Sequence, residues 1–315
     1  PAWSNSLFED NAEFGLGMRV AADQHMVMAK DLLTQLAPNF DADFVHALLQ
    51  TDLQSGNQMN AQRDRVGELK RRLQTLDDPR AKALLTIADH LVRRSVWLVG
   101  GDGWAYDIGS GGLDHALASG RNINVLVLDT EVYSNTGGQA SKSTPIGATA
   151  KFAAAGKAVT KKDLALQAIS YGNVYVARIA MGANPQQTLQ AMREAEAYQG
   201  PSLILAYSPC IAHGIDLRNS LTQQKLAVET GYWPLIRYNP LLRKAGRHPF
   251  VLDSPRPTRK IEEFAYNEQR YKLLQKNHPQ EAARLMQLAQ ESLDLRWHTY
   301  EHMSKQEPSE FQPTM

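Results

Sequence analysis

Cysteine is almost absent from this sequence: its 315 residues contain one, Cys210. A single cysteine cannot form a disulfide bond within the chain, so we expect an intracellular protein, and specifically a cytoplasmic one. Cys210 is then free, modified, or a ligand to a group that another segment also binds.

Long apolar runs and an excess of charge of one sign are lacking as well. The longest apolar runs, among them Val96–Val99 and Val125–Leu128, fall far short of the roughly 20 residues that a membrane helix needs. Lys and Arg number 34 against 33 Asp and Glu, which leaves a formal charge of +1. We therefore expect no membrane segment and no electrostatically driven binding of nucleic acid.

The beginning of the chain lacks an initiator Met, a signal-peptide hydrophobic region and an Arg-rich transit pattern. We therefore expect a processed chain or a piece of a longer one. Its length predicts one or two domains with a sizeable core.

The first part of the chain, residues 1–94, contains helix-length segments and no convincing strand. Asp78 is a suitable N-cap for the last of them, and Pro79 fits the first helical position. The expected helices are Met18–Leu36, Ala42–Leu53, Met59–Leu76 and Pro79–Arg94.

The hydrophobic pattern changes in residues 95–240, where short apolar or β-branched runs alternate with helix-length stretches. The expected strands are Val96–Val99, Val125–Leu128, Val174–Ile179, Leu203–Ala206 and Leu235–Tyr238. The expected helices are Gly111–Ser119, Lys162–Tyr171, Pro185–Tyr198 and Ser220–Thr230. Strands that are apolar on both faces and alternate with helices predict an α/β fold, with a mostly parallel sheet covered by helices.

The last part, residues 241–315, begins as a Pro- and Arg-rich connection and continues as two helical segments. In the second segment, apolar residues recur every three or four positions on one face, which we expect to pack on the α/β core or on a partner subunit. These residues are Ala282, Met286, Ala289, Leu293, Trp297 and Tyr300.

Two polar loops follow the first two expected strands. The first contains Gly100–Gly103 and the second Asp129–Gly138. An α/β sheet binds ligands at the carboxyl ends of its strands, and glycines let the backbone approach an anion closely. The carboxylate of Asp102 would repel a bare phosphate, so the loops predict a cation such as Mg²⁺ between this carboxylate and a diphosphate. Thr130 would add a hydroxyl ligand, and Val132 a main-chain carbonyl.

Two other interpretations of these loops stay open. A dinucleotide-binding G-x-G-x-x-G fingerprint would need a third glycine where the sequence has Tyr106, and its ribose-binding acid, Asp129, lies 26 residues after Gly103 rather than about 20. Alternatively, the loops are a tight turn and a surface loop of a non-catalytic binding or assembly module. A long Gly-rich loop is, however, costly to order without a ligand.

The wider sequence of the two loops, Gly101–Gly109 and Thr130–Gly138, resembles the pyruvate:ferredoxin (flavodoxin) oxidoreductase family. The resemblance covers nearly the whole chain, including Ser6–Gly15, and the matching region of the family is the C-terminal thiamine diphosphate-binding domain of a longer polypeptide. One departure from the wider thiamine motif is Thr130, where many such enzymes have Asn; within this family Thr is expected.

The resemblance implies the roles of individual residues. Mg²⁺ would be bound by the side chains of Asp102 and Thr130 and by the carbonyl of Val132. Asn135 would stand near the reactive thiazolium ring as a catalytic residue. The residues implied to bind the thiamine cofactor are Gly101, Asp102, Gly103, Trp104, Thr130, Glu131, Val132, Tyr133, Ser134 and Asn135.

Cys210 directly follows an expected strand, which places it at the same sheet edge as the two loops. On its residues alone, a buried and inert thiol is the plainer interpretation. In the family that the chain resembles, this position is the fourth cysteine ligand of a [4Fe-4S] cluster. A cluster needs about four thiolates, and the family's other three lie upstream, so this chain would supply one.

The resemblance implies oxidative decarboxylation of a 2-oxo acid, pyruvate, to acetyl-CoA and CO₂, with electrons passing through iron–sulfur clusters to ferredoxin or flavodoxin. The implied partners are the remaining domains of the same polypeptide, pyruvate and coenzyme A, and a second copy in a homodimer. This chain would not be active alone.

Other polar residues have plainer interpretations. His213 is expected to be an incidental loop residue near the surface. Lys157, Lys161 and Lys162 are expected to form a solvated basic face, although such a cluster could also meet an acidic electron carrier or the phosphates of coenzyme A.

Overall fold

A computed structural model describes residues 10–50, 56–134 and 136–307. The chain divides into two compact units, one formed by Gly15–Val96 and the other by Trp97–Met315 together with Pro1–Phe14. The division at residues 94 and 240 that the sequence suggested stays a prediction.

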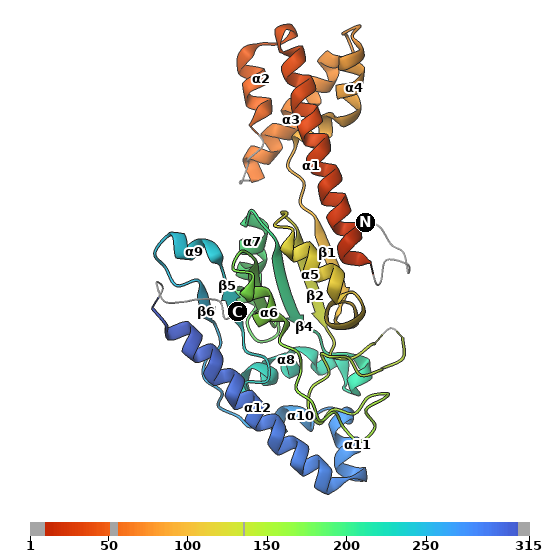
Figure 1. Ribbon diagram of the computed structural model, residues 1–315, viewed down its shortest axis with the longest axis vertical. Helices are drawn as coiled ribbons and strands as arrows, with labels where there is room; N and C mark the ends of the chain where they lie inside the picture. Colours follow the sequence, from red (N-terminus) through yellow and green to blue (C-terminus); the bar gives the residue numbers. More distant parts are fainter. Residues whose placement is uncertain (1–9, 51–55, 135, 308–315) are drawn as a thin grey trace. The chain divides into compact units, whose positions relative to one another are not determined.

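The first unit is helical. It contains most of α1 (Asn11–Leu36), then α2 (Ala42–Leu49), α3 (Gly56–Leu73) and α4 (Pro79–Ile87), which Figure 1 labels. The Asp78 carboxylate accepts a hydrogen bond of 2.7 Å from the main-chain N–H of Arg80 and so caps α4 as expected. The expected helix to residue 94 is too long, because a 3₁₀ turn over Ala88–Leu91 follows α4.

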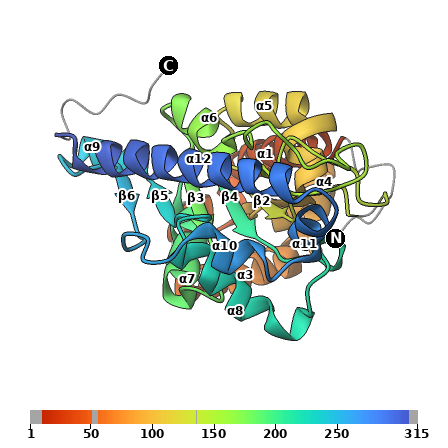
Figure 2. The ribbon, with the colours of Figure 1, turned by 90° about the horizontal axis from the view of Figure 1, so that it is seen from below.

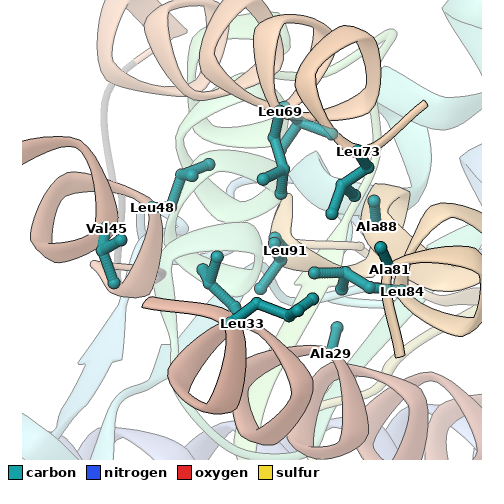
Figure 3. Packing of buried hydrophobic residues seen from close by; sticks show 12 residues of the cluster. Ala29, Leu33, Val45, Leu48, Leu69, Leu73, Ala81, Leu84, Ala88 and Leu91 are labelled. Atoms are coloured by element: carbon teal, nitrogen blue, oxygen red, sulfur yellow. The ribbon is translucent and has the colours of Figure 1, made fainter. Parts of the chain in front are cut away.

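Apolar side chains from all four helices meet in the core of this unit. Figure 3 shows Leu33, Leu48, Leu69 and Leu84 converging from different helices, and all four are buried. The buried amide of Gln62 donates hydrogen bonds to the carbonyls of Leu48 and Leu91, at 2.9 and 3.0 Å. This buried amide therefore pairs with carbonyl groups of the kind that helix ends leave unpaired.

The second unit is built on a six-stranded sheet in the order β1-β2-β4-β3-β5-β6. The first four strands of this order are parallel, whereas β5 is antiparallel to both of its neighbours. The mostly parallel α/β fold is thus confirmed. The strands are β1 (Trp97–Gly101), β2 (Asn124–Asp129), β3 (Tyr175–Ile179), β4 (Ser202–Tyr207), β5 (Ile236–Tyr238) and β6 (Phe250–Leu252).

The strand β6 was not expected, since the sequence analysis placed only helices beyond residue 240. It has three residues and lies in a Pro-rich stretch, so it is too short to show the alternation of apolar and polar residues that predicts a strand. Its backbone pairs with β5, from Ile236↔Leu252 to Tyr238↔Phe250.

Helices cover the sheet (Figures 1 and 2). Ala191 and Ala195 of α7 pack on Tyr175 and Ala177 of β3. The apolar face predicted between residues 282 and 300 is buried, and α12 packs against β6, α10 and α11. The helices are α5 (Ser110–Ala118), α6 (Leu164–Ser170), α7 (Pro185–Ala197), α8 (Ser220–Glu229), α9 (Pro240–Lys244), α10 (Ile261–Ala265), α11 (Gln269–Asn277) and α12 (Pro279–Lys305).

Among the described residues, no helix is both long and apolar enough to cross a membrane.

Candidate functional site

Three loops meet at one edge of the sheet, because β1, β2 and β4 are parallel neighbours. The register pairs Gly101 with Leu128 and Asp129 with Tyr207, so the strands end side by side. The residues that follow them, Asp102 and Thr130 among them, therefore come together although 28 positions separate them in the chain.

The three groups predicted to bind Mg²⁺ are adjacent. The hydroxyl oxygen of Thr130 lies 2.7 Å from Oδ1 of Asp102 and 3.1 Å from the carbonyl oxygen of Val132. Ser141, which the sequence analysis did not single out, donates a 2.8 Å hydrogen bond to Oδ2 of Asp102. These are hard oxygen donors of the kind that Mg²⁺ prefers.

Asp102 is a buried carboxylate, with 1% of its surface exposed. Burial, together with repulsion from Asp129, raises its pKa to about 7, although hydrogen bonds from Thr130 and Ser141 act in the opposite direction. A bound cation would offset the cost of burying this charge, so the residues present fit a divalent metal ion. Within the described parts of the chain, no group of three or more His, Cys, Asp or Glu side chains is placed to hold a metal ion. The hydroxyl and carbonyl oxygens are therefore essential to such a site.

The loop after β1 continues as one π-helical turn, Gly103–Ile108. A Cβ atom added at Gly103 would lie 2.5 Å from the Tyr133 ring, and one added at Gly100 would lie 2.4 Å from the Trp104 ring. These close approaches explain why both positions are glycine. The contact between Gly103 and Tyr133 also brings the first loop against the second. The indole N–H of Trp104 is buried and has no hydrogen-bond partner among the described residues.

Replacing Gly103 by Ala is expected to lower the free energy of unfolding by about 1–3 kcal/mol, because the added methyl group would displace the Tyr133 ring. Gly101→Ala is the matched control, since a Cβ there meets no atom within 4 Å. Urea unfolding of both variants measures the difference. Equal stability of the two variants would contradict the close approach.

The loop after β2 is held from inside the protein by Glu131. Its backbone has a φ of +58°, a conformation that residues other than glycine rarely adopt. Its buried carboxylate accepts hydrogen bonds from Lys161 at 3.0 Å, Arg270 at 2.8 Å and Tyr232 at 2.5 Å. Burial alone would raise the pKa of Glu131, but Lys161 and Arg270 lower it to about 2. Glu131 is thus ionised, and its carboxylate points into the protein.

Lys161 is not on a solvated face, contrary to the expectation for the basic cluster. Its side chain is 10% exposed, and its ammonium group also lies 2.8 Å from Asp129. Lys157 likewise turns inward and donates hydrogen bonds to the carbonyls of Ser141 and Thr144, at 3.0 and 2.6 Å. Both lysines therefore support the loops at the sheet edge.

Asp129 is not placed to bind a ribose. Its carboxylate is fully buried and accepts hydrogen bonds from Tyr106 at 2.7 Å, Ser143 at 2.5 Å and Lys161 at 2.8 Å. The dinucleotide interpretation needed this side chain and a glycine in place of Tyr106. The geometry therefore speaks against that alternative.

The rest of the second loop turns back on itself. The main-chain N–H of Tyr133 donates to the carbonyl of Gln139, and that of Gly138 donates to the carbonyl of Tyr133, at 3.0 and 2.8 Å. Ser134 is exposed. Asn135, the predicted catalytic residue, lies outside the described residues.

Cys210 lies in the loop after β4 and is partly buried. Its sulfur atom accepts a 3.4 Å hydrogen bond from the main-chain N–H of Ala212. One thiolate fits a cluster only as one of several ligands, and no other cysteine is present in the chain.

His213 connects this loop to the second loop, so its expected position near the surface is wrong. The ring is 1% exposed, and its Nε2 lies 2.5 Å from the carbonyl oxygen of Thr130. Because a carbonyl only accepts, Nε2 carries the proton, and Nδ1 accepts a 3.5 Å hydrogen bond from the N–H of Cys210. Burial and the charge of Arg270 lower the pKa of His213 to about 3, so the ring is neutral at physiological pH.

Comparison with known proteins agrees with the resemblance found in the sequence. Residues 81–206 match the family described as "Thiamine pyrophosphate enzyme, C-terminal TPP binding domain". The chain is 55% identical to a pyruvate-flavodoxin oxidoreductase of Trichormus variabilis over 98% of its own length and 26% of that protein's. It is 48% identical to a pyruvate:ferredoxin oxidoreductase of Moorella thermoacetica over 97% of its own length and 27% of that protein's.

A solved structure of 2-oxoglutarate:ferredoxin oxidoreductase from Magnetococcus marinus, with 2-oxoglutarate, coenzyme A and succinyl-CoA bound, is 25% identical. It covers 45% of this chain and 52% of its own with a TM-score of 0.35, which is too low to support a structural inference.

The chain spans about a quarter of the length of the curated relatives that it matches. Residues 81–206 carry the two loops that bring Asp102, Thr130 and Val132 together. This part of the chain matches the family of thiamine pyrophosphate enzyme C-terminal domains, and the whole chain is similar over nearly its full length to pyruvate-flavodoxin and pyruvate:ferredoxin oxidoreductases.

Proposed function

We propose that this chain is the thiamine diphosphate- and Mg²⁺-binding part of an oxidoreductase that decarboxylates pyruvate to CO₂ and acetyl-CoA. The observation that carries the proposal is the triad of oxygen donors from Asp102, Thr130 and Val132 at the ends of two parallel strands. The names of the relatives add the 2-oxo acid and the electron acceptor.

In this proposal the three donors would bind Mg²⁺ together with the cofactor's diphosphate. Gly101, Gly103 and Trp104 of the first loop, and residues 130–135 of the second, would hold the cofactor. Bound thiamine diphosphate supplies the C2 carbanion needed to decarboxylate a 2-oxo acid. The residues of this chain position and hold the charged end of the cofactor, and Asn135 stays the predicted catalytic residue.

Cys210 is proposed as one ligand of a [4Fe-4S] cluster whose other ligands lie outside this chain. His213 supports this role, because one neutral ring bonds the main chain at both Thr130 and Cys210. The ring would fix the position of the metal-binding loop relative to the cluster-binding loop. Electrons would leave through the cluster to ferredoxin or flavodoxin.

The remaining domains of a longer polypeptide would complete the active site and bind pyruvate and coenzyme A. We infer a homodimer and a cytoplasmic location, where a single thiol stays reduced.

Calorimetric titration of the intact protein tests the proposal. Thiamine diphosphate should bind in the presence of Mg²⁺ and lose most of its affinity in EDTA. A nicotinamide cofactor that binds without metal, or thiamine diphosphate binding that ignores EDTA, would overturn it.

The pH dependence of Mg²⁺ binding follows from the raised pKa of Asp102, about 7, against about 4 in an unfolded chain. Below pH 4 the protonated carboxyl group of Asp102 adds to the free energy of unfolding of the metal-free protein. This stabilisation is lost as the pH rises through 7. Protons compete with Mg²⁺ over the same range, so its affinity should rise about tenfold per pH unit up to pH 7 and then level off.

Titrating Mg²⁺ without thiamine diphosphate isolates this effect from the titration of the cofactor itself. In Asp102→Asn the pH dependence should disappear. A flat profile in the unmodified protein between pH 5 and 7 would contradict the assignment.

A further inference from the structure

A cavity with a volume of about 260 Å³ lies between α12, α6 and the sheet. Figure 2 shows α12 running across this side of the unit, with α6 beside it. Apolar side chains, including Ile146, Leu164 and Leu293, form much of its wall. Ligand pockets usually measure about 300–1,000 Å³, and this cavity lies just below that range, so it would hold only a small molecule.

The charged residues that line the cavity are four cations and two carboxylates. Both carboxylates already have partners. Glu131 is bonded as described above, and Asp163 accepts a 2.6 Å hydrogen bond from the Tyr300 hydroxyl and a 3.1 Å bond from the N–H of Leu166. The cations are Lys161, Lys162, Arg178 and Arg296.

Arg178, on β3, is 3% exposed, and within the described residues it forms no ion pair with a carboxylate. Burial would lower its pKa, but Tyr300 and the nearby charge of Asp163 raise it. Its guanidinium lies over the Trp233 ring, 4.2 Å from the centroid, and donates a 3.1 Å hydrogen bond to the Tyr300 hydroxyl. Its Nε atom is buried and has no hydrogen-bond partner among the described residues. Part of this buried cation is therefore unsatisfied.

Arg296, on α12, is partly buried and, among the described residues, also has an unpaired nitrogen. It donates to the carbonyls of Tyr232 and Gly231, at 2.6 and 3.3 Å, and its Nε atom is also buried without a partner in the described part of the chain. Burial and the nearby charge of Arg178 lower the pKa of Arg296. Within the described ranges, no carboxylate oxygen lies within 4.0 Å of the charged nitrogens of Arg178, Arg296 or Lys162.

The two guanidinium groups outnumber Asp163, the carboxylate beside the cavity whose charge acts on both of them. A buried excess of positive charge is costly. A carboxylate would satisfy them, because its two oxygens match the donor geometry of a guanidinium. The apolar wall would accommodate a short hydrocarbon body. We propose that this cavity binds a small organic carboxylate, with Arg178 and Arg296 as its charge partners and Lys162 as a further cation.

This site adjoins the proposed thiamine diphosphate site, because Glu131 of the second loop lines the cavity, but its cations are not part of the metal-binding contacts. Arg178, Arg296 and Lys162 take no part in the contacts of Asp102, Thr130 or Val132. The inference therefore stands whether or not the proposed function does.

The test is calorimetric titration of the intact protein in EDTA with two probes, glutarate and inorganic phosphate. Glutarate should bind at one site, and phosphate, which has no apolar part, should bind about tenfold more weakly. Equal binding of the two probes would show that the site recognises charge alone and would overturn the carboxylate assignment.

Variants locate the binding. Arg296→Lys and Lys162→Gln should each weaken glutarate binding about tenfold or more. The Lys162 variant guards against misfolding, because within the described residues its side chain makes no hydrogen bond or ion pair that the change would remove. Arg218→Gln, an exposed arginine paired with Asp216, is the control and should bind normally. Glutarate binding should also survive Asp102→Asn. No binding at millimolar concentrations, unchanged binding in Lys162→Gln, or loss of binding in Asp102→Asn would each overturn the proposal.

Discussion

Replacing Asp102 by Asn is expected to abolish Mg²⁺-dependent binding of thiamine diphosphate, with a loss of affinity of roughly 100-fold or more. The carboxylate is the only charged group among the three proposed metal donors, and the Thr130 hydroxyl and the Val132 carbonyl are neutral oxygens. Mg²⁺ gives up its hydration shell reluctantly, so a neutral amide cannot replace the carboxylate. Calorimetry with and without Mg²⁺ measures the loss.

The change keeps the shape of the side chain and removes a buried negative charge, so the metal-free variant should be at least as stable as the unmodified protein above pH 7. Loss of binding will therefore not reflect unfolding. Asp114→Asn, on the exposed part of α5, is the matched control and should bind normally. Magnesium-dependent binding that persists in Asp102→Asn would refute the loop assignment.

Cys210→Ser is expected to remove most of the electron transfer to flavodoxin or ferredoxin and to lower the iron content of the intact protein. A hydroxyl is a poor ligand for an iron–sulfur cluster, and this chain has no second cysteine to take its place. Binding of thiamine diphosphate should be retained, because the Asp102 and Thr130 donors do not depend on the sulfur atom. Iron analysis, the paramagnetic signal of the reduced cluster and a reductase assay give three independent readings.

Ile211→Ala is the control for this experiment, since the side chain is next in the same loop and is 74% exposed. It should leave iron content and electron transfer near their original values. If Cys210→Ser keeps its full iron content and its rate of electron transfer, the thiol is not a ligand, and the plainer interpretation of an inert cysteine holds.

The local patterns of the sequence predicted most of the second unit correctly. Five of its strands coincide with the short apolar runs at which strands were expected. These features depend on neighbours in the chain, which is why they can be read from it. The short strand β6 could not, because only its pairing with β5 defines it.

The environment of the site was less predictable. Lys161 and His213 looked like exposed polar residues, yet both are buried among charged groups. Their partners are distant in the chain: Lys161 lies 30 positions from Glu131, and His213 lies 83 positions from Thr130. One sequence signal was available for His213, which follows Cys210 by three residues at a strand end.

The sequence by itself determined that the turns containing Asp102 and Thr130 follow consecutive parallel strands. Apolar runs and glycines determine strands and turns through neighbouring residues, so they can be recognised in the sequence. Folding alone decided that Ser141 completes the contacts of Asp102, that Glu131 faces inward, and that Arg178 and Arg296 share a cavity. Burial and Coulomb interactions depend on distance in space. Distances between remote segments are set only when helices and sheet pack together.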